Sequence, residues 1–407
     1  MSRPTRRILC LAFCLALLGP WPLAARADAA LDWLSTVDEA TTKVRGIRGD
    51  RARTIAWLAA FNALDAIDPR FRPYPPAPAA LPADASKPSR DAALATALYT
   101  VLVLEPDADQ ALLVRRYRET LATVKVAGER EVGAILGQQA ALMLLAARST
   151  DRLGRVEPRP STAARGVFVE ATGSKMPRSV AIVGLAPFGV RSVLAFDPGP
   201  PPAAGSDAAA REIAEVRALG GVASSARSAD QTAAALFWVA NEPTDFASWI
   251  KGVLEARKLD ALDLVRIAAL DAMIGIDSAI VGTTLKERYL HWRPESAIAG
   301  PFAADRDAAW APMVRAPNSP DYPSTGATSA GILEVELPRL FGVDGTVEWS
   351  NSATQQTRRW PNGAALADEL GASRIWAGAH FRSSVDAGRR VGREVAREIL
   401  ERQLLPR

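Results

Sequence analysis

Two basic residues, Lys286 and Arg293, lie seven positions apart at the end of a long apolar stretch. Seven residues make nearly two turns of an α-helix, so both side chains are expected on one helix face, about 10 Å apart. Long cationic side chains at this spacing can converge on one tetrahedral anion. The alternative interpretation is a solvated helix face, which is the usual role of such a pair.

A predicted helix start and a second basic segment offer further ligands for an anion. Pro323-Ser324-Thr325-Gly326 is expected to open a helix, whose free amides and positive dipole end favour an anion. Arg374 supplies a planar fork of donors that suits phosphate-like oxygens, and His380 supplies an imidazole that serves as nucleophile or ligand. Taken singly, Arg374 could pair with a nearby acid, and His380 could be a hydrogen-bonded core histidine.

Together these segments resemble the three motifs of the superfamily of vanadium-dependent haloperoxidases and type 2 phosphatidic-acid phosphatases. Those motifs read K-x6-R-P, P-S-G-H and S-R-x5-H-x3-D. Lys286 to Pro294 matches the first in full, and SRIWAGAH, from Ser373 to His380, matches the Ser, Arg and His of the third. AFNALDAID, from Ala60 to Asp68, resembles an upstream family pattern, A-F-D/N-A-x-x-A-I-D. The resemblance is greatest to the soluble haloperoxidase branch.

This resemblance implies a fold of two packed four-helix bundles around a pocket for vanadate, or for phosphate as an alternative ligand. It implies that His380 binds vanadium axially, as the metal ligand, or attacks phosphorus in a phosphatase. The residues that would hold the remaining oxygens are Lys286, Arg293, Ser324, Thr325 through its backbone amide, and Arg374.

Three positions depart from the family's pattern, of which one is Thr325, where the second motif has glycine. Gly326 stands where the second motif has a histidine that acts as general acid or base. Ser384 stands where the third motif has an aspartate that orients its histidine. A positioned acid or base contributes about 10²–10⁴-fold to a rate, and an orienting partner about 10-fold or more. The sequence therefore predicts an intact oxyanion pocket without its proton-transfer groups.

Neither Asp386 nor His291 is expected to replace these groups. Ser383-x-x-Asp386 has the spacing of a helix capping box, which we favour over a displaced histidine partner as the role of Asp386. His291 precedes Arg293 by two residues and would lie about 200° around the helix, facing away from the pocket.

Apolar periodicity predicts an all-α fold. Residues recur at helical spacing in segments 52–64, 91–104, 108–124, 129–148, 207–219, 229–240, 244–257 and 260–291. The Pro-rich stretch 72–88 is expected to be a loop. The stretch 157–205 lacks a helical period and is predicted to be an ordered, loop-rich surface excursion, with weak alternation at 167–182 that suggests short strands.

The first 27 residues are expected to be a secretory signal peptide. Arginines precede the apolar run from Ile8 to Leu18, and Ala25-Arg26-Ala27 fits a cleavage site. Both cysteines, Cys10 and Cys14, lie in this segment, which excludes disulfides and cysteine-based metal sites from residues 28–407. We expect those residues to form one haloperoxidase-like helical domain located in the periplasm or secreted.

Charge and motifs exclude several other classes of protein. The sequence carries a net charge of +4, all of which the four arginines of the signal segment account for, so nothing favours a nucleic-acid partner. No span of 18 apolar residues follows the signal, so no integral membrane segment is expected. The Ala327–Gly331 segment lacks the first glycine of a serine-hydrolase elbow, and no C-x-x-C-H haem motif is present.

Three functions remain open from the sequence. The first is a vanadium-dependent peroxidase that oxidises halide, and the second is an acid phosphatase that forms a phosphohistidine at His380. The third is a non-catalytic or repurposed protein that binds a phosphate-like anion, which the change at Gly326 favours. A homo-oligomer is compatible with all three.

Overall fold

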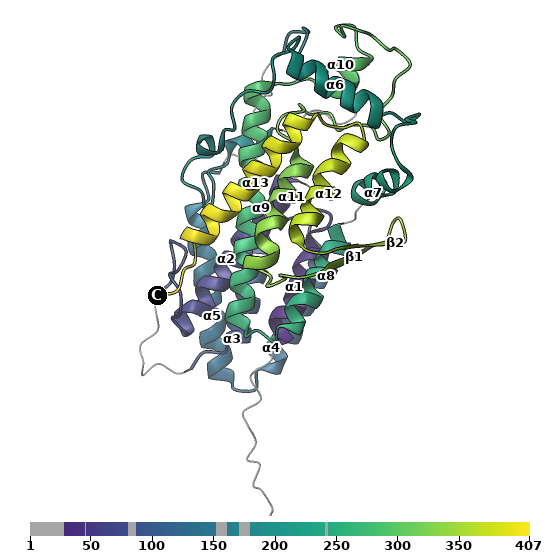
Figure 1. The fold of residues 1–407 in the computed structure, drawn as a ribbon. Helices are drawn as coiled ribbons and strands as arrows, with labels where there is room; N and C mark the ends of the chain where they lie inside the picture. Colours follow the sequence, from purple (N-terminus) through teal and green to yellow (C-terminus); the bar gives the residue numbers. More distant parts are fainter. Residues whose placement is uncertain (1–27, 45, 80–86, 152–160, 171–179, 241–242) are drawn as a thin grey trace, which may run out of the picture.

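The computed structural model describes residues 28–44, 46–79, 87–151, 161–170, 180–240 and 243–407. The predicted signal peptide, residues 1–27, lies outside these residues. The described chain is mainly helical, which confirms the predicted all-α class, and its helices form two packed groups (Figure 1). In the described part, no helix has the length and apolar character needed to cross a membrane.

The first group contains the N-terminal helices. These are α1 (Asp28–Thr41), α2 (Ile47–Ile67), α3 (Arg90–Leu102), α4 (Gln110–Thr123) and α5 (Ala127–Ala147). Helix α5 lies very close to α3, because a Cβ atom at Gly137 would come within 2.2 Å of the Ala93 carbonyl oxygen. The predicted helices agree with α3, α4 and α5 to within a few residues, whereas α2 begins earlier than predicted and α1 was not predicted.

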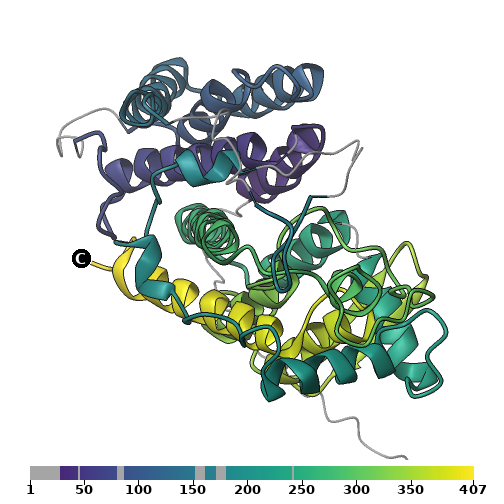
Figure 2. The same ribbon diagram turned by 90° about the horizontal axis from the view of Figure 1, so that it is seen from above.

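The second group contains α9 (Ala261–Tyr289), α11 (Thr325–Arg339), α12 (Gly363–Trp376) and α13 (Arg382–Arg402). Helix α9 packs against α2 of the first group and against α11 and α13 of its own. Seen from above, the green α9 lies between the purple and blue N-terminal helices and the yellow C-terminal ones (Figure 2). The long α9, more than half of whose residues are buried, therefore joins the two halves.

Helices α11 and α13 approach each other through glycines on both sides. A Cβ atom at Gly331 would lie 2.0 Å from the Arg389 carbonyl oxygen, and one at Gly392 would lie 2.1 Å from that of Thr328. This close contact brings the N-terminus of α11 beside the start of α13, where the Ser324 amide donates to the Ser384 carbonyl at 2.9 Å.

Shorter elements cover the second group. They are α6 (Asp207–Leu219), α7 (Ala229–Val239), α8 (Pro243–Ala256), α10 (Pro294–Ile298), β1 (Val347–Asn351) and β2 (Gln356–Trp360). The two strands form an antiparallel hairpin that the sequence did not predict. Its buried face places Trp349 within 5.4 Å of Trp238 and 6.0 Å of Trp249, measured between ring centroids. The hairpin thus serves to close an aromatic cluster.

The excursion before α6 holds no strand in its described residues. It contains two short 3-10 turns, Ala181–Gly184 and Val193–Phe196, and an isolated bridge between Val167 and His291. The predicted alternating strands are therefore wrong for this part. The buried Asp277 carboxylate of α9 anchors the excursion by accepting the amides of residues 188–190 at 2.7–2.9 Å.

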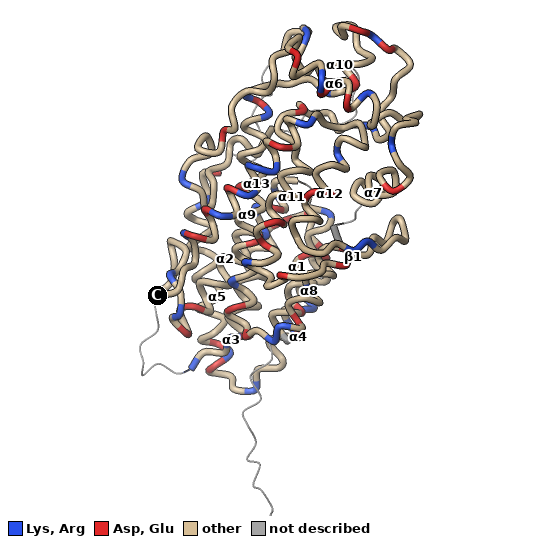
Figure 3. Tube along the Cα trace, viewed as in Figure 1, with Lys and Arg blue, Asp and Glu red and all other residues tan. Residues whose placement is uncertain are grey.

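Acidic and basic residues are interspersed along the chain in Figure 3.

Candidate oxyanion site

The end of α9 positions Lys286 and Arg293 differently from the sequence prediction. Leu290 adopts a left-handed conformation, with φ 45° and ψ 42°, and ends the helix, so Arg293 precedes α10 instead of extending α9. The prediction that Lys286 and Arg293 share one helix face is therefore wrong. Both side chains are nevertheless buried, at 5% exposure each, and both reach the loop before α11. Lys286 Nζ donates to the Pro320 and Asp321 carbonyls at 2.7 and 3.1 Å.

His380 lies between α12 and α13 and is oriented from both sides. Its Nδ1 is 2.8 Å from Asp321 Oδ1, and its Nε2 is 3.0 Å from Arg293 Nη1. A hydrogen on Nδ1 would donate to the carboxylate and leave the Nε2 lone pair to accept from the guanidinium. Gly378, whose φ of +75° favours glycine, turns the chain from α12 to His380.

Asp321 is the site residue that the sequence analysis missed. Its side chain is fully buried, and its Oδ2 atom has no hydrogen-bond partner among the described residues. It is the one acidic residue in the PDYPSTGATSAG segment, three residues before Ser324. A single acid within a segment expected to bind an anion is the signal that could have identified it. Asp321 supplies the orienting carboxylate that the sequence placed at the degenerate position 384.

Ser384 and Asp386 have other roles. The Ser384 hydroxyl donates to the Asp321 carbonyl at 2.8 Å and lies 3.3 Å from His380 Nδ1, so it supports the same pair. Asp386 is exposed and is not a partner of His380. The predicted capping box is also wrong, because α13 begins at Arg382 and Ser383 donates instead to the Glu212 carboxylate of α6.

The N-terminus of α11 meets the site through Ser324. Its hydroxyl is fully buried and accepts the Ala327 amide at 3.3 Å as the helix cap, which confirms the predicted helix start. The Thr325 side chain is exposed, so the predicted contact of this residue with an anion stays with its backbone amide. His291 lies outside α9, and its ring packs edge-on against Phe381 with centroids 5.7 Å apart.

Arg374 lies across Gly326 at the same helix start. A Cβ atom at Gly326 would come within 2.7 Å of Arg374 Cδ, so the absence of a side chain at position 326 makes room for the arginine. Arg374 Nε donates to the Ser373 hydroxyl at 3.0 Å, whereas the buried Nη2 has no partner in the described structure. One donor of this guanidinium is therefore available to a ligand.

Burial and mutual repulsion weaken the charged forms of the basic groups. Burial, with Arg293 and Lys286 nearby, lowers the pKa of His380 well below its usual value. Burial and then Arg293 lower the pKa of Lys286 strongly, and burial lowers the pKa of Arg374 to about 10. Burial also raises the pKa of Asp321 to about 7, although Arg293 and Lys286 oppose that shift. Lys286 and Arg293 thus share one carboxylate, Arg374 adds a further cation near His380, and the site favours an added anion.

Comparison with known proteins places the fold of this chain. Residues 266–404 match the family model described as the VCPO second helical-bundle domain. A bacterial vanadium-dependent iodoperoxidase shares the fold, with a TM-score of 0.78 and 18% identity over 95% of this chain and 98% of its own. A bacterial vanadium-dependent chloroperoxidase in its holo form gives a TM-score of 0.65 and 14% identity over 90% and 92%. A search of curated sequences finds no match.

The family match runs from within α9 to the end of α13 and includes Lys286, Arg293, Arg374 and His380. The structural matches extend the shared fold to the N-terminal helices as well. Residues 266–404 thus match the second helical-bundle domain of the VCPO family, and the chain as a whole shares the fold of bacterial vanadium-dependent haloperoxidases.

Proposed function

We propose that the buried cluster around His380 binds vanadate and that the protein is a peroxidase for easily oxidised halide. The observation that carries this proposal is the buried positive charge of Lys286 and Arg293 around a single carboxylate, Asp321, together with a buried Arg374 Nη2 donor that has no partner in the described structure. An oxyanion bound among them would supply the missing countercharge and accept the free Arg374 Nη2 donor.

The residues present fit vanadate. Lys286, Arg293, Arg374, Ser324 and the Thr325 amide would contact its oxygens, as the family resemblance implies. Asp321 holds the His380 ring through Nδ1, so Nε2, which contacts Arg293 in this structure, is the His380 atom that would hold vanadate. Bound vanadate supplies activation of peroxide for transfer of an oxygen equivalent to a halide.

Iodide is the halide that we propose. Gly326 brings no acid or base to the helix start, so proton transfer must come from water. Iodide is the most easily oxidised of the common halides and therefore needs the least activation. The likeness to a structure described as an iodoperoxidase supports this choice.

A phosphatase reaction is the second candidate, because His380 Nε2 is presented as a nucleophile would be. Without an acid at position 326, only phosphate esters with leaving groups of low pKa would react. A non-catalytic role in anion binding is the third candidate function, and the experiment below distinguishes it from the other two.

The test uses purified protein from residue 28 onward, loaded with vanadate for the halide assay and free of vanadate for the phosphate-ester assay. We expect stoichiometric vanadium and peroxide-dependent oxidation of iodide to triiodide, with little oxidation of chloride and little hydrolysis of p-nitrophenyl phosphate. His380→Ala should abolish turnover, whereas Arg339→Ala, at an exposed ion pair with Glu401, should not. Hydrolysis of the phosphate ester without iodide oxidation would favour the phosphatase. Vanadate binding without either reaction would leave only anion binding.

Export completes the proposal. We propose that residues 1–27 are removed and that the protein acts in the periplasm or is secreted. N-terminal sequencing of protein from the producing cell should begin at Asp28, and an intact N-terminus in the cytoplasm would contradict this.

A further inference from the structure

A cavity of about 370 Å³ lies next to the oxyanion site, among α7, α8, α9, α11, α12 and β1. Its walls include three aromatic side chains, Trp238, Phe246 and Trp349. The Trp349 ring lies 5.3 Å from that of Phe246 and 5.4 Å from that of Trp238, between centroids. Aromatic faces gathered in this way favour a planar apolar group or a cation.

Three buried polar atoms in the walls of this cavity have no partner among the described residues. They are Glu336 Oε1, Trp349 Nε1 and Arg374 Nη2. Glu336 is 1% exposed, so its carboxyl is removed from water without compensation from the protein. An unpaired buried polar group is costly, and a ligand that pairs with it recovers that free energy.

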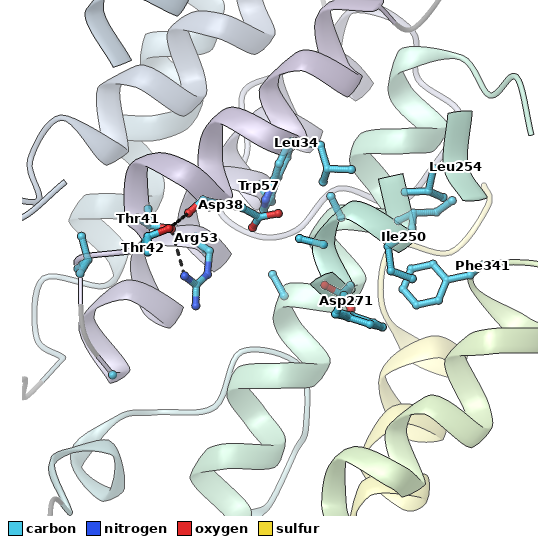
Figure 4. A pocket seen from close by; sticks show the side chains of 17 residues that line it. Leu34, Asp38, Thr41, Thr42, Arg53, Trp57, Ile250, Leu254, Asp271 and Phe341 are labelled. Carbon is cyan, nitrogen blue, oxygen red and sulfur yellow. Dashed lines mark hydrogen bonds between the residues drawn. The ribbon is translucent and has the colours of Figure 1, made fainter. Parts of the chain in front are cut away.

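The charges around Glu336 are mostly acidic. Asp271 of α9 lines the same cavity and also an adjoining cavity of about 540 Å³, which Figure 4 shows. Asp38 of α1 and Arg53 of α2 line that adjoining cavity too. Burial, and then Asp271, raises the pKa of Glu336 well above its usual value. Burial, and then Asp38, raises the pKa of Asp271 to about 7.

The only cation lining the 370 Å³ cavity in the described structure is Arg374, at its other end beside Gly326. Ten residues of α11 separate Gly326 from Glu336, which corresponds to about 15 Å along the helix axis. The arginine is therefore a remote countercharge for Glu336. A cationic ligand at the acidic end of the cavity would lie closer to the Glu336 carboxylate than Arg374 does.

We propose that this cavity binds an arylalkyl primary amine, with its ammonium group at Glu336 and Asp271 and its ring among Trp238, Phe246 and Trp349. The carboxylates supply charge-assisted hydrogen bonds, and the aromatic faces attract the ammonium and pack against the ring. This site lies beyond the proposed vanadate chemistry and requires neither vanadate nor His380.

The test is calorimetric titration of vanadate-free protein with 2-phenylethylamine, and with 2-phenylethanol as its neutral counterpart. We expect the amine to bind at least 10-fold more tightly than the alcohol, and more tightly at pH 8 than at pH 6. The sign follows from the raised pKa values, because the carboxyls must lose their protons before they can pair with an ammonium, and rising pH removes them.

Variants separate this site from the oxyanion site. Glu336→Gln should weaken amine binding at least 10-fold, and Trp349→Phe should weaken it several-fold. Glu334→Gln, on the same helix but paired with Arg389, should leave it unchanged, as should His380→Ala. Equal binding of alcohol and amine, no binding of either, or unchanged binding by Glu336→Gln would each overturn the proposal, whatever the peroxidase assay shows.

Discussion

Buried polar side chains of α2 and those around the oxyanion site differ in whether the described residues satisfy them. In α2, Asn62 donates to the carbonyls of Tyr74 and Pro76 and accepts the Tyr74 amide at 2.9 Å. Asp65 accepts the amides of Arg70 and Phe71 at 2.9 and 2.8 Å. Every such bond holds the loop after α2, so the upstream family pattern has a structural role in this chain.

The second group leaves comparable atoms unpaired. Asp321 Oδ2, Glu336 Oε1 and Arg374 Nη2 are buried and lack partners in the described residues. Satisfied polar groups stabilise a fold, whereas unsatisfied ones reduce stability unless a ligand pairs with them. The contrast predicts that changes in the first set affect folding and changes in the second affect ligand binding.

The largest expected effect is on folding, at Asp65. Asp65→Ala leaves two buried amides unpaired and removes the ion pair with Arg407, so the free energy of unfolding should fall by about 3 kcal/mol. Urea denaturation measures this change. The shift in melting temperature caused by vanadate should persist in the variant. A loss of stability below about 1 kcal/mol would contradict a purely structural role.

An effect of about 2 kcal/mol is expected at Asp271, and it should depend on pH. The folded-state pKa is raised from 3.8 to about 7, so the folded protein retains a proton that the unfolded chain loses, and stability falls as pH rises through this interval. Asp271→Asn should therefore gain stability relative to the parent between pH 4 and pH 8. Parallel stability curves for the two proteins would show that the carboxyl titrates normally.

The sequence predicted most helices because their apolar residues recur at helical spacing over long segments, as in α3 and α5. It failed at Arg293, because a left-handed Leu290 is not a turn signal that residue type reveals. The pairing of Lys286 with Arg293 was still correct, since the family motif records a spatial relation that the assumed helix did not. The β1–β2 hairpin was missed because Val347 and Trp349 alternate with polar residues over only five positions.

The sequence could not identify Asp321 as the acid partner of His380, because 59 residues separate the two along the chain. Only the close packing of α11 on α13 brings the two together. Ser384→Asp, which the motif alone suggests as a repair, would place a second carboxylate beside a buried one. Like charges in a buried site raise each other's pKa values, so this change should lower stability without improving the site.

An effect of about 1 kcal/mol, of opposite sign to that at Asp65, is expected at Arg374. In the described structure its guanidinium makes one side-chain hydrogen bond, to Ser373, and burial lowers its pKa to about 10. Arg374→Met should therefore raise the free energy of unfolding of the anion-free protein. The same variant should lose most of the vanadate-induced shift in melting temperature. Arg358→Met, at an arginine paired with Glu369 and Asp230, should instead lower stability.

The smallest expected effect on stability, below about 1 kcal/mol, is at Gly326. A new Cβ atom there must displace Arg374 Cδ, which belongs to a flexible side chain, so Gly326→Ala should fold well and lose several-fold in vanadate affinity. Gly326→His displaces Arg374 in the same way but adds an imidazole at the helix start. If the missing acid or base limits turnover, the histidine variant should oxidise iodide about 10-fold faster than the alanine variant at saturating vanadate. Comparison of these two variants separates the added bulk from the added chemistry. The gain should vanish when His380→Ala is introduced as well, and equal rates in Gly326→Ala and Gly326→His would show that proton transfer is not what limits this site.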